Sequence, residues 1–216
     1  MHTTTAQLHP LTPAPLPFAP SLHARAFVVP REHDNLLVYN SPALGGDAAA
    51  IEDLGGASHQ YLNHWHESMF GDDSIRDDLG IRLVVHEADG AATAERLTVD
   101  ATFSEHGSLG GGFELIPTPG HTPGATAFLW DSGERRYLFT GDTIYLIDGE
   151  WVAAVLDSSD RDAYLRSLEL LRDVEFDVLV PWAASAGRAW YAETDSADAR
   201  RRIGAIIDRI SRGQDR

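Results

Sequence analysis

The sequence predicts an α/β domain in which helices cover β-sheets, and two observations support this fold class. Four short apolar segments between residues 99 and 140 are each bounded by Gly, Pro or Asp, as strands joined by turns are. A regular helix from about 159 to 173 is then followed by the apolar strand FDVLVP at 176–181 and by a last helix near 196–210. A run of strands followed by helix, strand and helix is typical of layered α/β folds.

The N-terminal part of the chain divides into an arm and the start of the domain. Residues 1–22 are rich in Pro and polar side chains, and we expect an extended arm packed on the surface of a domain that comprises residues 23–216. The apolar segments AFVVP (26–30) and NLLVY (35–39) flank the turn-like REHD and predict a hairpin. DAAAIEDL (47–54) predicts a helix that stops at a pair of glycines.

The middle of the chain alternates between short strands and short helices. The pattern predicts a strand at QYLNH (60–64), a helix near 72–79, the strand IRLVVH (81–86) and a short helix around 90–97. The four strands that follow are VDATF (99–103), FELIP (113–117), TAFLW (126–130) and RYLFT (136–140).

The two C-terminal helices have the clearest periodicity. Ser159 and Asp162 have the spacing of a capping box at the start of the first helix, with Asp in place of Glu. Apolar residues recur at helical spacing in both helices. They are Leu165, Leu168, Leu171 and Val174 in the first helix, and Ile203, Ile206, Ile207 and Ile210 in the second.

The composition excludes several classes of function. A net charge of −16 disfavours nucleic acid and anionic membrane as partners. All 17 basic residues are Arg, so lysine Schiff-base chemistry is excluded. The chain has no Cys, so a metal ion would have to be held by His and carboxylate side chains.

The location and the partners follow from what the chain lacks. The first residues show neither the basic start nor the apolar run of a signal peptide, and no stretch has the apolar length needed to span a bilayer. We therefore expect a cytoplasmic protein with a small-molecule substrate, and a homodimer is kept open as its assembly.

The stretch HWHESM (64–69) has the beginning of a metal site. Ten His in 216 residues give roughly half an H-x-H pair by chance, so the pair alone is weak evidence. It gains weight because it follows a short apolar strand. In an extended chain residues i and i+2 point to the same side, so His64 and His66 could face one ion.

Two further motifs place candidate functional side chains at the ends of predicted strands. TPGHTPG (118–124) sets His121 in a tight turn between two predicted strands, where Pro and Gly present one side chain rigidly. LFTGD (138–142) delivers Asp142 at the end of an apolar strand, after a Gly that allows close backbone approach.

HWH, TPGHTPG and LFTGD in this order, followed by a helix and a strand ending in Pro, resemble the metallo-β-lactamase superfamily. The resemblance covers residues 27–182, and TPGHTPG with FTGD some twenty residues later is its specific part. It implies a four-layer αββα sandwich with metal ions at one edge of the sheets. The full pattern of that family is H-x-H-x-D-H, then the His of a PGH turn, the Asp of GD, and a His in a final PGH.

Only part of this pattern is present in the chain. His64, His66, His121 and Asp142 match it. The positions that depart from it belong to the second metal site of the family, and they hold Ser68, Met69, Trp182 and Ala183. The resemblance therefore implies one divalent ion held by the three histidines, with Asp142 as fourth ligand or as base to a bound water. Zinc is the first candidate, and iron and manganese are the alternatives.

Three other residues are candidates near this site. Glu67 is a candidate catalytic residue, as a proton shuttle in place of the missing acid, although we favour a solvated carboxylate that points away. His33 lies in the early hairpin turn, which overhangs the site in the family, and could contact substrate. Trp182 could fill the vacated second site or stack on a ligand, and packing is the role that we favour.

The resemblance leads to three hypotheses for function. The favoured one is a mononuclear metal-dependent hydrolase that uses a metal-activated water on an ester, a thioester or a lactone. The second is a non-haem iron dioxygenase similar to persulfide dioxygenase, in which His64, His121 and Asp142 form a facial triad. The third is a non-catalytic metal-binding module.

Overall fold

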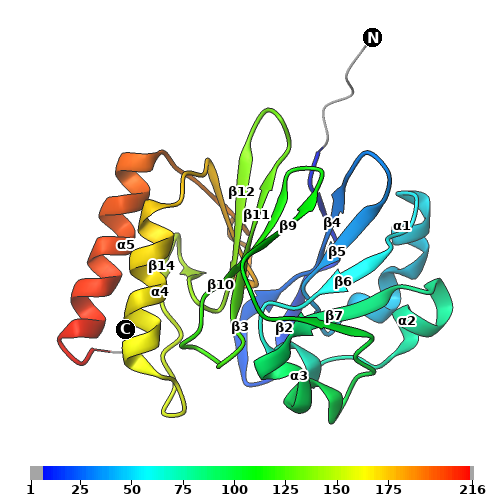
Figure 1. Ribbon diagram of the computed structural model, residues 1–216, viewed down its shortest axis with the longest axis horizontal. Helices are drawn as coiled ribbons and strands as arrows, with labels where there is room; N and C mark the ends of the chain where they lie inside the picture. The colour runs from blue at the N-terminus through cyan, green and yellow to red at the C-terminus, as the bar shows by residue number, and fades with distance from the viewer. Residues whose placement is uncertain (1–6, 215–216) are drawn as a thin grey trace.

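The computed structural model describes residues 7–214, which form the four layers helix, sheet, sheet and helix (Figure 1). Helices α4 and α5 cover one large sheet, helices α1, α2 and α3 lie outside the other, and the two sheets face each other between them. The expected αββα sandwich is confirmed. No helix within residues 7–214 is long and apolar enough to cross a membrane.

The first large sheet carries the segment that precedes the His pair. Strands β4 to β8 follow one another in space as in sequence, and the β5–β6, β6–β7 and β7–β8 pairs are parallel. Its strands are β1 (His9–Pro10), β4 (Phe27–Pro30), β5 (Asn35–Val38), β6 (His59–Tyr61), β7 (Arg82–His86) and β8 (Ala101–Phe103). The helices on its outer side are α1 (Ala48–Asp53), which follows the 3-10 turn η1 (Leu44–Asp47), α2 (Ser74–Leu79) and α3 (Glu87–Ala94).

The second large sheet carries the other two motifs. Strands β9 to β12 form an antiparallel series, and β12 pairs in parallel with β15. Its strands are β9 (Gly107–Gly110), β10 (Phe113–Pro117), β11 (Thr126–Asp131), β12 (Arg136–Gly141), β15 (Val178–Pro181) and β17 (Ala192–Glu193). Its helices are α4 (Arg161–Asp173) and α5 (Ser196–Ser211).

The segment predicted to be an arm takes part in two sheets. β1 pairs with β4, while β2 (Ala14–Leu16) and β3 (Ala19–Ala24) form a hairpin in a third sheet. The other strands of that sheet are β13 (Tyr145–Ile147), β14 (Glu150–Val152) and β16 (Ala183–Ser185). Leu8, Leu11 and Leu16 are buried, so this segment contributes to the core. Residues 1–6 of the predicted arm lie outside the described residues.

Successive side chains of a strand point to opposite faces of the sheet, which explains how one strand contributes to two layers of the core. Phe27 and Val29 of β4 point into the core between the two large sheets, where they meet Phe128 and Phe139. Val28, between them, points the other way into the core under the helices of the first sheet. Because both faces of these strands are buried, the sequence shows continuous apolar runs rather than alternation with polar residues.

The start of α4 differs from the prediction. The N-cap is Asp160, whose side chain accepts a hydrogen bond from the Ala163 N–H, rather than Ser159. The Ser159 hydroxyl instead donates to the main-chain carbonyl of His121, 3.2 Å away. The predicted capping box is wrong because the adjacent Asp can cap the helix, which leaves Ser159 free to support the PGH turn.

A buried carboxylate on α3 joins the segments that carry the site motifs. Asp89 is 2% exposed, and it accepts hydrogen bonds from the Trp65 N–H (3.0 Å), the Thr122 hydroxyl (2.6 Å) and the Gly124 N–H (2.8 Å). Trp65 stands between the two histidines of the HWH motif, and Thr122 follows His121. A single side chain therefore fixes the distance between the two segments.

Tyr39, the residue after β5, joins this strand to β15 and to the last residue of β12. The Tyr39 hydroxyl donates to the Val180 carbonyl and accepts from the Gly141 N–H, both at 2.8 Å. Gly141 has a φ of +54°, and a Cβ at this position would lie 1.8 Å from Oδ1 of Asn63. Only glycine allows this approach, which brings the GD motif against the residue before His64.

We predict that Asp89→Ala lowers the free energy of unfolding of the metal-free protein by about 3 kcal/mol or more, because three buried donors lose their acceptor. Asp89→Asn should recover part of the loss, since its amide oxygen can still accept from Trp65 and Thr122. The measurement is urea denaturation followed by circular dichroism.

The matched control is Glu87→Ala on the exposed side of the same helix. It should cost less than about 1 kcal/mol, since only a favourable charge near a helix N-terminus is lost. Equal losses in the two Ala variants would contradict the assignment of Asp89.

Candidate metal centre

Three histidine side chains converge where the strands of the two large sheets end. His64, His66 and His121 each offer one ring nitrogen, and these atoms lie within 4.8 Å of one another. The first two follow β6, and the third lies in the loop between β10 and β11. Within residues 7–214 this is the one group of three or more potential metal ligands with such spacing.

The HWH pair does not lie in an extended segment, so that part of the prediction is wrong. β6 ends at Tyr61, His64 is still extended (φ −156°, ψ 159°), and the 3-10 turn η2 (Trp65–Met69) begins directly after it. The side chain of Glu67 causes this turn, because its Oε1 accepts from the N–H groups of Asn63 (2.8 Å) and His64 (3.3 Å). The two imidazoles meet because the chain turns between them.

The PGH turn holds His121 rigidly, as predicted. Gly120 has a φ of +142°, and a Cβ there would lie 2.4 Å from the Cα of Tyr164 on α4. Only glycine lets the turn pack this closely against the helix. Nδ1 of His121 lies 2.7 Å from the carbonyl oxygen of Ala154. Its Nδ1–H therefore donates to that carbonyl, and the Nε2 lone pair faces the other histidines.

His64 has a ring nitrogen without a hydrogen-bond partner within residues 7–214. Its Nδ1 lies 3.0 Å from Oδ1 of Asn63 and 3.3 Å from Oε1 of Glu67, so the proton resides on Nδ1. Its Nε2 is buried and has no hydrogen-bond partner among the described residues. Since buried polar atoms are nearly always satisfied, an orphan lone pair beside two other histidines fits a bound cation.

The His66 nitrogen lies slightly nearer to that of His121 than two ligands of one metal ion do. Nδ1 of His66 lies 3.0 Å from Nε2 of His121. Two ligand nitrogens on a tetrahedral zinc ion are about 3.4 Å apart, given bonds of about 2.0–2.1 Å. The donor set of three imidazoles suits zinc, and it also suits iron.

Burial keeps His64 and His66 in the form that binds metal. Burial lowers the pKa of His64 to about 3, and the nearby carboxylate of Asp142 opposes this shift. Burial also lowers the pKa of His66 to about 3, with the neighbouring His64 and His121 acting in the same direction. Both imidazoles are therefore neutral at pH 7, and their lone pairs are available to an ion.

Asp142 lies beside this cluster. Its Oδ2 is 3.7 Å from Nε2 of His64 and 3.7 Å from Nε2 of His121. These distances exceed the ligand spacing on a tetrahedral ion by only about 0.3 Å. The side chain is 18% exposed, whereas those of the two histidines are at most 1% exposed. Asp142 thus stands between the nitrogens and the solvent, as a fourth ligand or a base would.

Glu67 is not the solvated carboxylate that the sequence suggests. It is fully buried behind His64, and its Oε2 accepts from the Asn40 N–H at 2.7 Å. Burial raises the pKa of Glu67 to about 8, while the N–H groups of Asn40, Asn63 and His64 act in the opposite direction. Its oxygens face the main chain and Nδ1 of His64, so it positions this histidine rather than touching a substrate.

The residues at the positions of the second set of ligands either contact the main chain, pack in the core or face solvent. The Ser68 hydroxyl donates to the carbonyl of Trp65 at 2.7 Å. Met69 is 41% exposed. Trp182 is buried as a packing residue, with its ring 5.2 Å from that of His64, and its Nε1–H donates to the main chain.

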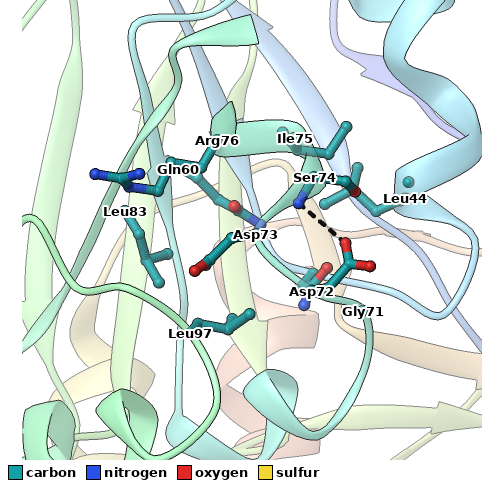
Figure 2. Close-up of a pocket in the computed structure, with 12 residues that line it drawn as sticks. Leu44, Gln60, Gly71, Asp72, Asp73, Ser74, Ile75, Arg76, Leu83 and Leu97 are labelled. Carbon is teal, nitrogen blue, oxygen red and sulfur yellow. Dashed lines mark hydrogen bonds between the residues drawn. The ribbon is translucent and has the colours of Figure 1, made fainter. Parts of the chain in front are cut away.

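Two other acidic or imidazole groups lie away from the cluster. Figure 2 shows Asp72 in a small cavity beside α2, where its carboxylate accepts from the N–H of Ser74 at 2.9 Å, and none of the described histidines lines this cavity. His33 is exposed in the loop before β5, whereas the Glu67 contact lies after the other end of that strand, at Asn40. The expectation that the turn with His33 overhangs the site is wrong, because this turn lies at the opposite end of the strands from the histidine cluster.

A cavity of about 290 Å³ opens beside Asp142. Most of its lining is apolar, and it comes from the β2–β3 hairpin and the segment after β14. Ala154, whose carbonyl accepts from His121, is one of the lining residues, so the cavity adjoins the cluster.

Sequence analysis missed the residues that support the ligands. Asp89, Asn63 and Ala154 each contact a ligand segment or a ligand side chain. Ala154 acts through its main chain, which leaves no signal in the sequence. Asp89 is one of 33 acidic residues, and its position after a buried strand is the one signal that could have drawn attention to it.

Comparisons with known proteins agree with this geometry. The family model of the metallo-beta-lactamase superfamily matches residues 45–183, which is more than half of the chain. No curated protein matches the sequence.

Solved structures show the same fold at low sequence identity. The metallo-beta-lactamase from Pontibacter korlensis is 16% identical with a TM-score of 0.70, over 98% of this chain and 97% of that chain. The metallo-beta-lactamase from Hirschia baltica is 17% identical with a TM-score of 0.69, over 96% and 95%. ETHE1 from Myxococcus xanthus is 16% identical with a TM-score of 0.61, over 87% and 85%. Together with the family match, the fold and the three-histidine cluster lead to one conclusion: the chain belongs to the metallo-beta-lactamase superfamily.

Proposed function

We propose that this protein is a metal-dependent hydrolase that holds one divalent ion, for which zinc is the first candidate. Its substrate in this proposal is a small ester, thioester or lactone. The observation that carries the proposal is the buried, unpartnered Nε2 of His64 beside two further histidine nitrogens. The cytoplasmic location and the homodimer that the sequence leaves open stay predictions.

The ligands in this proposal are His64, His66 and His121, with Asp142 on the open side. A divalent ion held there supplies a Lewis acid and lowers the pKa of a coordinated water. The Oδ2 of Asp142 lies where it can accept the proton that an attacking water loses. Asn63, Glu67 and the Ala154 carbonyl hold the outer nitrogens of the ligands, so that the inner lone pairs stay aligned.

The contacts around the cluster support one ion rather than two. The positions that would hold a second ion contain a hydroxyl donating to the main chain, a methionine and a buried tryptophan ring. Asp72, the next acidic residue after Met69, lines another cavity. A single Lewis acid suits reactive acyl bonds better than phosphodiesters, and the net charge of −16 also disfavours nucleic acid as substrate.

A second candidate function is an iron-dependent oxygenase. Oδ2 of Asp142 is equally distant from Nε2 of His64 and of His121, at 3.7 Å. Two histidines and one carboxylate in such a triangle are the facial triad of non-haem iron oxygenases. Oxygen consumption with iron-loaded protein would separate this candidate from the hydrolase. A non-catalytic module is disfavoured because a cavity adjoins the carboxylate.

We predict that zinc binding saturates near one ion per chain, because one complete set of ligands is present. Protein dialysed against chelator and then titrated with zinc should show this stoichiometry by elemental analysis after gel filtration. Two tightly held ions would contradict the mononuclear proposal.

We predict that His121→Ala lowers metal affinity at least tenfold to hundredfold, because a ligand is worth at least as much as the groups that orient it. Hydrolysis of esters and thioesters should fall with it. His106→Ala is the control, since that side chain is 65% exposed and outside the cluster. A His121→Ala protein that retains the metal content and turnover of the native protein would rule out the site.

We predict that the protein keeps its fold without metal, because its core is large enough to be stable alone. The far-UV circular dichroism spectrum should be unchanged at room temperature after treatment with chelator. Loss of the spectrum would show that the ion is structural.

A further inference from the structure

The cavity beside Asp142 is bounded by apolar side chains from two separate segments. The β2–β3 hairpin contributes Leu16, Phe18, Ala19 and Leu22, and the opposite side is formed mainly by residues 153–156 with Tyr145 and Ala183. Phe18, in the turn of the hairpin, is 66% exposed, and Leu156 is 43% exposed. Large apolar side chains exposed around a cavity favour an apolar ligand that would cover them.

The charge of the cavity restricts that ligand further. Asp142 is the one charged side chain among the residues that line the cavity, and the lining contains no Arg or His. A carboxylate or phosphate at the end of the ligand away from the metal cluster would therefore find no cationic side chain among the described residues of the lining. The net charge of −16 acts in the same direction.

A row of aromatic rings links the hairpin to the histidines. The ring of Phe18 lies 6.3 Å from that of Phe70, which lies 5.7 Å from that of Trp182. The Trp182 ring in turn lies 5.2 Å from that of His64. Phe70 and Trp182 are buried and do not line the cavity, so these rings pack between the hairpin and the metal cluster.

We propose, on the basis of the hydrolase proposed above, that this cavity binds an uncharged apolar chain of the substrate. The preferred substrates are then neutral esters, thioesters or lactones with an aliphatic chain of about eight carbons, since 290 Å³ holds roughly that number of groups at about 30 Å³ each with some space left over. Water adds its oxygen to the acyl carbon, and the bond to the leaving oxygen or sulfur breaks. The proton that water loses passes through Oδ2 of Asp142 to the leaving group.

The first experiment measures kcat/KM of the zinc-loaded protein for p-nitrophenyl esters of acetic to decanoic acid. The value should rise about tenfold to hundredfold from the acetyl to the octanoyl ester, because burying each methylene group favours binding. The mono-p-nitrophenyl ester of suberic acid has the same chain length and a terminal carboxylate, and it should lose most of this gain. A flat profile, or equal turnover of the two eight-carbon esters, would overturn the proposal.

Variants test whether the preference for long acyl chains arises from the β2–β3 hairpin. Phe18→Ala should reduce the ratio of octanoyl to acetyl turnover several-fold, mainly through KM. Phe18→Arg should reverse part of the discrimination against the suberyl ester, because it places a cation at the cavity. Leu170→Ala is the control, since this leucine is 50% exposed on α4 and does not line the cavity. An octanoyl preference that Phe18→Ala leaves unchanged would overturn the assignment of this cavity.

A binding measurement separates this proposal from the hydrolase itself. 2-Decanone, a neutral ketone that cannot be hydrolysed, should bind the metal-free protein in a calorimetric titration, and Phe18→Ala should weaken it. Binding without turnover of any ester would support the cavity and reject the hydrolase. Turnover without a dependence on chain length would support the hydrolase and reject the cavity. If neither binding of the ketone nor turnover of an ester is observed, both the cavity assignment and the hydrolase are rejected.

Discussion

The carboxylate of Asp89 holds the two segments that carry the three histidines in a fixed relation to each other. It receives hydrogen bonds from Trp65, between the first two histidines, and from Thr122 and Gly124, after the third. Besides this carboxylate, Asn63 joins the two segments, since its main-chain carbonyl accepts from the Thr126 N–H at 2.8 Å. Because this acid is buried and fully engaged, the position of the nitrogens is set before any ion arrives.

A second layer of contacts determines which nitrogen of His64 and which nitrogen of His121 is free. Glu67 and Asn63 act on His64, and a main-chain carbonyl acts on His121. These partners occupy the outer nitrogens, so the inner ones keep their lone pairs. The geometry of the centre thus depends on groups that never touch the ion, and Glu67 belongs with them although it lies next to a ligand in the sequence.

Sequence patterns predicted the fold well where periodicity and turn residues agree. The apolar strands β4, β5, β7, β10, β11, β12 and β15 and the helices α4 and α5 were expected near their observed positions. Four strands of the third sheet, β2, β13, β14 and β16, were missed because three residues carry no usable period.

The site residues were predicted by motif, but their surroundings were not. Glu67 was expected to face solvent because local alternation cannot show that a turn of the chain buries it. The buried leucines of the N-terminal segment were missed because Pro-rich sequence resembles a linker, although proline is tolerated in edge strands such as β2.

The hairpin of β2 and β3 lies outside the part of the chain that the family model matches, which begins at residue 45. The metal cluster lies within that part together with residues 153–156 of the cavity, so the hairpin is the one wall of the cavity that the family model does not match. Substitutions near Phe18 can change which molecules enter without disturbing the groups that hold the ion. A lineage can therefore diversify at its N-terminal end while the rest of the domain stays the same.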